Sequence, residues 1–257
     1  MDLRLGTAQL TALLFAAARA GAWLAIAPPF AGRTMPTPVK ALLSVAIALP
    51  VAPQLVAHVP TVDSPQWMIS LAEQVVVGAA LGFLTSLVFA AVQAAGSLID
   101  LFGGFSMAFA FDPFGMSGNT GTAAFGRFYN LLATTLLFAT DAHELMLRGF
   151  TTSYHTLPID GTLSLATLRD LLTTGATQMF LGALQIAGPL VAVLFCTDLA
   201  LGLLNRVAPA LNVLSLAFPA KILLTLSAAG VAIAVLPHTL TDLVDRAVHA
   251  VVQAAGG

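Results

Sequence analysis

Residues 67–99 read WMISLAEQVVVGAALGFLTSLVFAAVQAAGSLI, and Glu73 is the only charged residue among them. An α-helix rises about 1.5 Å per residue, so this stretch would extend roughly 50 Å, whereas the hydrocarbon core of a bilayer is about 30 Å thick. Tilting absorbs only part of that excess length. We therefore predict a membrane helix that either breaks or is covered along much of its length by protein instead of lipid.

The composition of the whole chain agrees with a membrane protein. Of 257 residues, 58% are hydrophobic and 9% are charged, whereas soluble domains carry about 45–50% apolar and about 25% charged residues. The net charge of −2 provides no basic face for nucleic acid. The single cysteine, Cys196, excludes a disulfide framework and a cysteine-based zinc site. These figures exclude an ordinary cytosolic enzyme, a disordered chain and a nucleic-acid-binding protein.

Five further hydrophobic segments accompany the first one, at residues 9–28, 39–59, 128–146, 176–204 and 211–237. A spanning helix needs about 20 predominantly apolar residues, so each segment is a candidate. Prolines inside three of them predict broken or kinked helices, namely Pro50, Pro53, Pro189 and Pro219. We predict an all-α integral membrane protein with about six hydrophobic helical segments, forming a single polytopic domain over residues 1–257.

The orientation of the chain in the membrane does not follow from its cations. Arg19 interrupts the first segment and Pro28 follows it, so we expect an internal helix there and no cleavable signal peptide. Lys and Arg counts in alternating loops give four on each side. Such a tie arises by chance in a charge-poor chain, or because the helices do not all cross the bilayer as lipid-facing spans.

Residues 102–128 read FGGFSMAFAFDPFGMSGNTGTAAFGRF and stand apart from the rest of the chain. They contain seven of the sixteen phenylalanines, two methionines and six glycines, together with the turn-forming pair Asp112-Pro113. A long apolar, glycine-rich loop is unusual in a compact protein and is often functional. We predict a loop that is covered by protein, because so many aromatic side chains would be unstable in water.

Two glycines follow Glu73 on the long segment. Gly78 and Gly82 form a GxxxG pair on one helix face, which lets a neighbouring backbone approach closely. We predict a tight helix–helix contact there; the alternative is that glycine is simply common in membrane helices and that Glu73 extends to the interface. A buried Glu73 carboxylate would need a partner. The candidate partners are Arg19, Arg206 and Lys221.

A second polar group lies between the last two hydrophobic segments. Arg206, Pro209 and Asn212 predict a short rigid turn, in which Arg206 and Asn212 satisfy carbonyl groups that the prolines leave free. Lys221 lies several residues into the last apolar segment. It either extends its ammonium group to the interface or contacts another subunit.

Known catalytic motifs are missing from the sequence. His143 and Glu144 begin an HExxH-like pattern, but Leu147 stands where the second histidine would be, so a zinc site is not expected. Together with Asp141 they indicate a polar helix end, or else a proton relay. Residues 115–121 lack the lysine of a phosphate loop, and no GxSxG motif occurs. We expect no enzymatic activity, cofactor, nucleotide or metal.

Five stretches together resemble the flagellar biosynthetic FliR family and its virulence counterparts in type III secretion. The resemblance begins at Arg19 and covers nearly the whole chain. The stretches are PPFAGRTMPTPVKALLSVAIALPVAP at 28–53, EQVVVGAALGF at 73–83, QAAGSLIDLFGGFSMAFAFDP at 93–113, DAHELMLRGFTTSYHTLP at 141–158 and GLLNRVAPALNVLSLAFPAKI at 202–222. Two positions differ, because the family usually has Gln where this chain has Phe102 and Ala210.

The resemblance implies a subunit of a helical protein export gate in the bacterial inner membrane, at the flagellar basal body. Its implied partners are FliP- and FliQ-type membrane subunits, an FlhB-type switch protein and unfolded secretion substrates. The alternatives are the gate of a virulence secretion system or a secondary transporter. The residues implied in helix packing or subunit contacts are Glu73, Gly78, Gly82, Gly96, Arg206, Pro209, Asn212 and Lys221.

The resemblance also implies that the loop at 102–128 is a plug that closes the pore. The physical argument is that phenylalanine and methionine side chains pack into a constriction that excludes water. We expect the closed pore to be sealed by this loop, with plug and gating residues Phe105, Met107, Phe109, Phe111, Asp112, Pro113, Phe114 and Met116.

Overall fold

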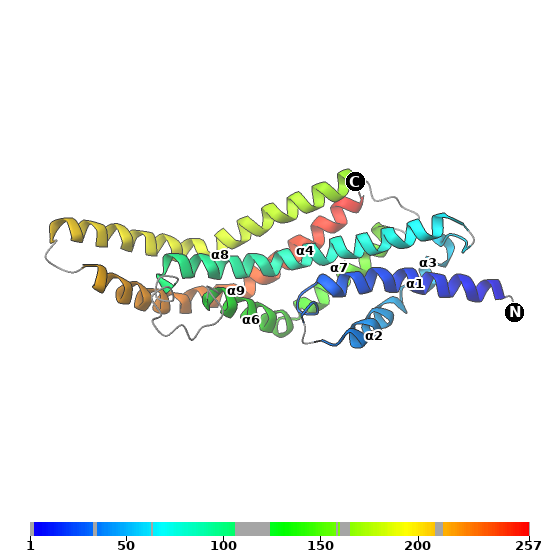
Figure 1. The fold of residues 1–257 in the computed structure, drawn as a ribbon, viewed down its shortest axis with the longest axis horizontal. Helices are drawn as coiled ribbons and strands as arrows, with labels where there is room; N and C mark the ends of the chain where they lie inside the picture. The colour runs from blue at the N-terminus through cyan, green and yellow to red at the C-terminus, as the bar shows by residue number, and fades with distance from the viewer. Residues whose placement is uncertain are drawn as a thin grey trace. The chain divides into compact units, whose positions relative to one another are not determined.

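The computed structural model describes residues 3–32, 35–62, 64–105, 124–157, 159, 165–208 and 213–256. These ranges contain helices and no β-strand, which confirms the predicted all-α class. In chain order the elements are α1 (Leu3–Ile26), α2 (Thr37–Ala48), α3 (Ala52–Leu55), the 3-10 turn η1 (Val56–His58), α4 (Gln66–Phe102), α6 (Ala124–Ala139), α7 (Ala142–Thr156), α8 (Leu165–Val207) and α9 (Val213–Gly256) (Figure 1).

Proline determines the boundaries of the first helices. α1 ends at Ile26, just before Pro28, and α2 begins after Pro36 with Pro38 in its first turn, where a missing N–H costs nothing. The predicted segment 39–59 is broken as expected. The chain bends by 64° between α2 and the α3–η1 pair, and Pro50 lies between these two elements.

The long segment is one unbroken helix. α4 runs for 37 residues, and half of its most apolar window is buried within the chain. The sequence left two alternatives for this segment. The prediction that the helix breaks is wrong, and the prediction that protein covers much of it is confirmed. The coverage explains how an apolar helix longer than the bilayer is thick can remain stable.

The count of six spanning segments is not confirmed. In the described residues three helices are long and apolar enough to span a membrane, or four if the bent pair counts as one span. The predicted segment 128–146 is two helices, because the chain turns at Asp141, whose φ is 55°. Conversely, α8 and α9 extend over 43 and 44 residues, beyond the apolar stretches that predicted them.

Contacts divide the chain into two compact units, each described here by itself. The first contains residues 1–87, 141–177 and 244–257. In this unit α1 lies along the first half of α4, drawn blue and cyan in Figure 1. Its core includes Trp23 of α1, whose indole stacks on Phe150 of α7 with ring centroids 4.6 Å apart.

The second unit contains residues 88–140 and 178–243. It is built from the second half of α4, from α6, and from the larger parts of α8 and α9. Its core consists of fully or almost fully buried side chains from all four helices: Ile99, Tyr129, Leu194, Leu236 and Leu240. The same unit carries Phe105 and Ala124, the described residues on either side of 106–123.

Candidate functional site

A fully buried arginine joins three helices of the first unit. Arg19 of α1 has no exposed surface. Its Nε donates to Gln74 Oε1 of α4 at 2.8 Å, and its Nη2 donates to the same oxygen. Its Nη1 donates to Ser153 O at 2.9 Å and its Nη2 to Leu157 O at 2.7 Å. The guanidinium group therefore binds carbonyl groups at the end of α7, where a helix dipole favours a cation.

Tyr154 completes this arginine site. The guanidinium carbon of Arg19 lies 4.5 Å from the centre of the Tyr154 ring, as in a cation–π contact. The phenol donates a hydrogen bond to Ala16 O at 2.7 Å. Burial raises the pKa of Tyr154 above its usual value, so the phenol stays protonated and remains a donor.

The sequence suggested that Arg19 could pair with Glu73. In the structure Arg19 bonds instead to Gln74, the next residue along α4. Gln74 is almost fully buried against Arg19. Glu73 is half-buried and lines a cavity of about 440 Å³ together with His58, Gln66 and Ser70. Nothing in the sequence marked Gln74 or Tyr154 as a site residue, because a single amide or phenol within a helix can have many roles.

The GxxxG pair faces α1 in the first unit. A Cβ atom at Gly78 would collide with Arg19 O and lie 3.0 Å from the Cβ of Ala22. A Cβ atom at Gly82 would lie 2.9 Å from Trp23 O. Real Cβ atoms do not approach backbone atoms so closely, so the two helices can pack at this distance only because both residues are glycine.

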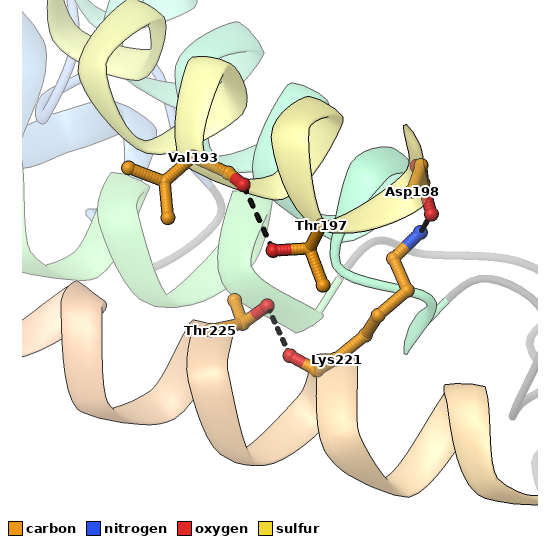
Figure 2. Close-up of polar contacts among 5 residues, drawn as sticks. All are labelled: Val193, Thr197, Asp198, Lys221 and Thr225. Carbon is orange, nitrogen blue, oxygen red and sulfur yellow. Dashed lines mark hydrogen bonds and ion pairs between the residues drawn. The ribbon is translucent and has the colours of Figure 1, made fainter. Parts of the chain in front are cut away.

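In the second unit Lys221 of α9 forms an ion pair with Asp198 of α8. Figure 2 shows the Lys221 side chain extending from α9 across to the Asp198 carboxylate on α8, and Nζ lies 2.7 Å from Oδ1. The Lys221 side chain is 13% exposed and that of Asp198 is 43% exposed. One turn later, Thr225 donates to Lys221 O at 2.7 Å. Lys221 therefore has a partner within its own chain, Asp198, which neither of the two alternatives drawn from the sequence had included.

The residues flanking 106–123 lie together in the second unit. The rings of Phe105 and Phe125 are 5.0 Å apart in an edge-to-face arrangement. A Cβ atom at Gly96 would lie 2.5 Å from Phe125 O, so α4 and the start of α6 touch at their backbones. Asp100 Oδ2 accepts a hydrogen bond from Gly126 N at 3.1 Å. Asp100 was not singled out from the sequence, although it lies in the same stretch, 93–113, as Gly96.

Other predicted site residues lie outside the described ranges or at the surface. Arg206 is exposed in the last turn of α8. The predicted residues outside the described part of the chain are Met107, Phe109, Phe111, Asp112, Pro113, Phe114, Met116, Pro209 and Asn212.

In the polar group at the start of α7, Asp141 and Glu144 are exposed and His143 is half-buried. Glu144 pairs with Arg148 at 3.4 Å, one helical turn away and largely in solvent. In the described ranges no three His, Cys, Asp or Glu residues come together as a metal site.

Comparison with known proteins identifies the family. Residues 10–247 match the model of the family described as bacterial export proteins, family 1. The chain is 32% identical to the flagellar biosynthetic protein FliR of Pectobacterium carotovorum subsp. carotovorum, over 87% of this chain and 86% of that protein. It is 34% identical to FliR of Escherichia coli (strain K12), over 77% and 75% of the two chains.

A relative with a different name matches over a smaller part of the chain. The surface presentation of antigens protein SpaR of Shigella flexneri is 28% identical, over 60% of this chain and 58% of that protein. The family match spans both compact units, and the long apolar helices agree with a membrane protein. The chain belongs to family 1 of the bacterial export proteins.

Proposed function

We propose that this chain is a non-enzymatic subunit of the type III protein export gate that exports flagellar components during flagellum assembly, in the bacterial inner membrane at the flagellar basal body. The observation that carries the proposal is the identity to the FliR proteins of Pectobacterium carotovorum and Escherichia coli over most of the chain, which exceeds the identity to SpaR in both value and coverage. The gate of a virulence secretion system is the alternative that the SpaR match supports.

The proposed partners follow from the family. They are FliP- and FliQ-type membrane subunits, an FlhB-type switch protein and unfolded secretion substrates. The large apolar side chains that remain exposed on α8 fit a chain that is covered by lipid or by other subunits; examples are Phe180 and Phe195, which are 70% and 54% exposed.

A clean deletion of the gene is expected to abolish filament assembly and to remove hook and filament proteins from the culture medium. A plasmid copy should restore both. The measurement is motility together with an immunoblot of the medium. Normal motility and secretion in the deletion strain would contradict the flagellar proposal, and export of virulence effectors would then be measured next.

Residues 102–128 are proposed to act as the plug of this gate. Replacing Phe109, Phe111 and Phe114 together by serine should make the cells leak ions and small solutes, because polar side chains admit water to a constriction that phenylalanine keeps dry. The measurement is entry of a small impermeant dye at equal amounts of assembled gate. The triple leucine variant is the matched control and should stay closed. Equal dye entry in the serine variant and the wild type would exclude the plug.

A further inference from the structure

The proposed export function makes no use of the polar cavity in the first unit. This cavity has a volume of about 440 Å³ and is lined by residues 57–60, by the first two turns of α4 and by Ile159. All of these residues belong to the first unit. The polar side chains in the lining are His58, Gln66, Ser70 and Glu73, and the remaining lining residues are aliphatic.

Three of the polar side chains lie on one face of α4. Gln66, Ser70 and Glu73 are separated by four and three residues, a spacing that makes side chains neighbours along a helix. Gln66 is exposed, whereas Ser70 and Glu73 are half-buried. The Glu73 carboxylate and the Ser70 hydroxyl are therefore one turn apart and partly withdrawn from solvent.

A neighbouring face of the same two turns is fixed to α1. Trp67 packs edge-to-face on Phe15 of α1, with ring centroids 5.6 Å apart. Gln74 accepts its hydrogen bonds from the buried Arg19. Because α4 is held at both ends of residues 67–74, the cavity wall is formed before a ligand arrives, and a preformed wall lowers the entropy cost of binding.

Glu73 has no cationic partner in the part of the chain that the structure describes. No ion pair or side-chain hydrogen bond there involves its carboxylate. Two of the partners that the sequence suggested are engaged elsewhere, because Arg19 binds Gln74 and Lys221 binds Asp198. A partly buried carboxylate in an apolar helix is costly without a positive charge beside it. A cation bound in the cavity would remove this cost.

The lining favours one class of cation. No Phe, Tyr or Trp is among the described residues that line the cavity, so a quaternary ammonium would lack the aromatic faces that usually bind it. A primary ammonium group has three N–H donors. Acceptors on the same helix face are the Glu73 carboxylate, the Ser70 hydroxyl and the Gln66 amide oxygen. The aliphatic surface for a carbon chain comes from Val59, Pro60, Ile69 and Ile159.

We propose that this cavity binds a primary ammonium group carried on a short carbon chain, with Glu73 as the counter-ion and Ser70 as a second acceptor. Two kinds of molecule share this chemistry, namely phospholipids with an ethanolamine headgroup and free aliphatic diamines. The site is independent of the export function, because it consists only of residues 57–73 and 159 of the first unit.

The test measures which lipid the full chain retains when it is purified in detergent together with the proteins that accompany it. In equal amounts of phosphatidylethanolamine and phosphatidylcholine, native mass spectrometry should show about a tenfold preference for phosphatidylethanolamine, the order expected for one charged hydrogen bond. Glu73→Gln should lose this preference. Glu144→Gln is the matched control, since it removes an exposed carboxylate on α7 that pairs with Arg148. It should keep the preference.

A second arm separates the two sources of the ammonium group. Putrescine is titrated into the lipid-free chain by calorimetry. Binding that Glu73→Gln abolishes, without a lipid preference, would support the site and identify the free diamine as its ligand. A wild type with neither lipid preference nor putrescine binding overturns the proposal, as does a preference that Glu73→Gln retains. If Glu73→Gln does not accumulate, Ser70→Ala decides: the preference should fall severalfold, and an unchanged preference overturns the proposal.

Discussion

Replacing Arg19 by leucine is expected to remove the chain from the membrane almost completely. The substitution leaves Gln74 Oε1 and Leu157 O without the guanidinium donor in the first unit, whereas Ser153 O keeps the hydrogen bond from Leu157 N–H. A buried acceptor without a partner costs about 1–3 kcal/mol, so two of them, together with the lost contact to the Tyr154 ring, remove a large part of the stability of an ordinary domain, which is about 5–15 kcal/mol. The measurement is the amount of chain in the membrane fraction and its resistance to protease.

Two further variants separate the hydrogen bonds from the charge. Arg19→Lys keeps the charge, but an ammonium group cannot reach acceptors in three directions as the planar guanidinium does. We therefore expect the amount of chain in the membrane fraction to be only slightly higher for Arg19→Lys than for Arg19→Leu. Arg148→Leu is the matched control on α7, because the Arg148 side chain is largely exposed and its ion partner within the described residues is Glu144, one turn away on the same helix. It should accumulate normally. Normal accumulation of Arg19→Leu would show that the arginine site does not hold the three helices together.

Replacing Gly78 by a larger residue is expected to have the second largest effect on the amount of folded chain. Even the Cβ of alanine would collide with Arg19 O and lie 2.9 Å from the Arg19 carbonyl carbon. Because these are backbone atoms, α1 and α4 can only move apart, and that movement disturbs the bonds of Arg19 as well. We expect Gly78→Ala to reduce the amount of folded chain severalfold and Gly78→Val to abolish it, as measured by thermal aggregation in detergent.

Gly188 provides the control for glycine in a helix. A Cβ atom there has nothing within 4 Å, and alanine is favoured over glycine in helices by about 1 kcal/mol. Gly188→Ala should therefore be neutral or stabilising in the isolated chain. If Gly78→Ala behaved like Gly188→Ala, the close approach of α1 and α4 would not matter for stability.

The parts of the fold that depend on local chemistry could be predicted from the sequence. Pro28 marks the end of α1, Pro50 marks the bend after α2, and the glycines of α4 mark a close helix contact. The break between α6 and α7 could not be predicted, because neither proline nor glycine stands at Thr140 or Asp141. The full lengths of α8 and α9 were missed because their ends carry charged residues that remain helical but lower the local hydropathy.

The partners of the charged residues depend on how the helices pack, which a single sequence does not encode locally. Glu73 and Gln74 are neighbours, yet only Gln74 meets Arg19. Lys221 and Asp198 belong to different helices, so their pairing requires the register between α8 and α9. The charged members of the candidate site could therefore be predicted as residue types, whereas Gln74, Tyr154 and the contacts among all members emerged only in three dimensions.

The pairing of Lys221 with Asp198 has a consequence for biogenesis. A charged side chain at the centre of a helix leaving the translocon costs about 2.5–3.5 kcal/mol. If α8 entered the lipid before α9 had been synthesised, Asp198 would carry that cost alone. When both helices enter as a hairpin, the two charges leave water as a neutral pair 2.7 Å apart. We therefore expect α8 and α9 to enter the membrane together, as a single unit of insertion.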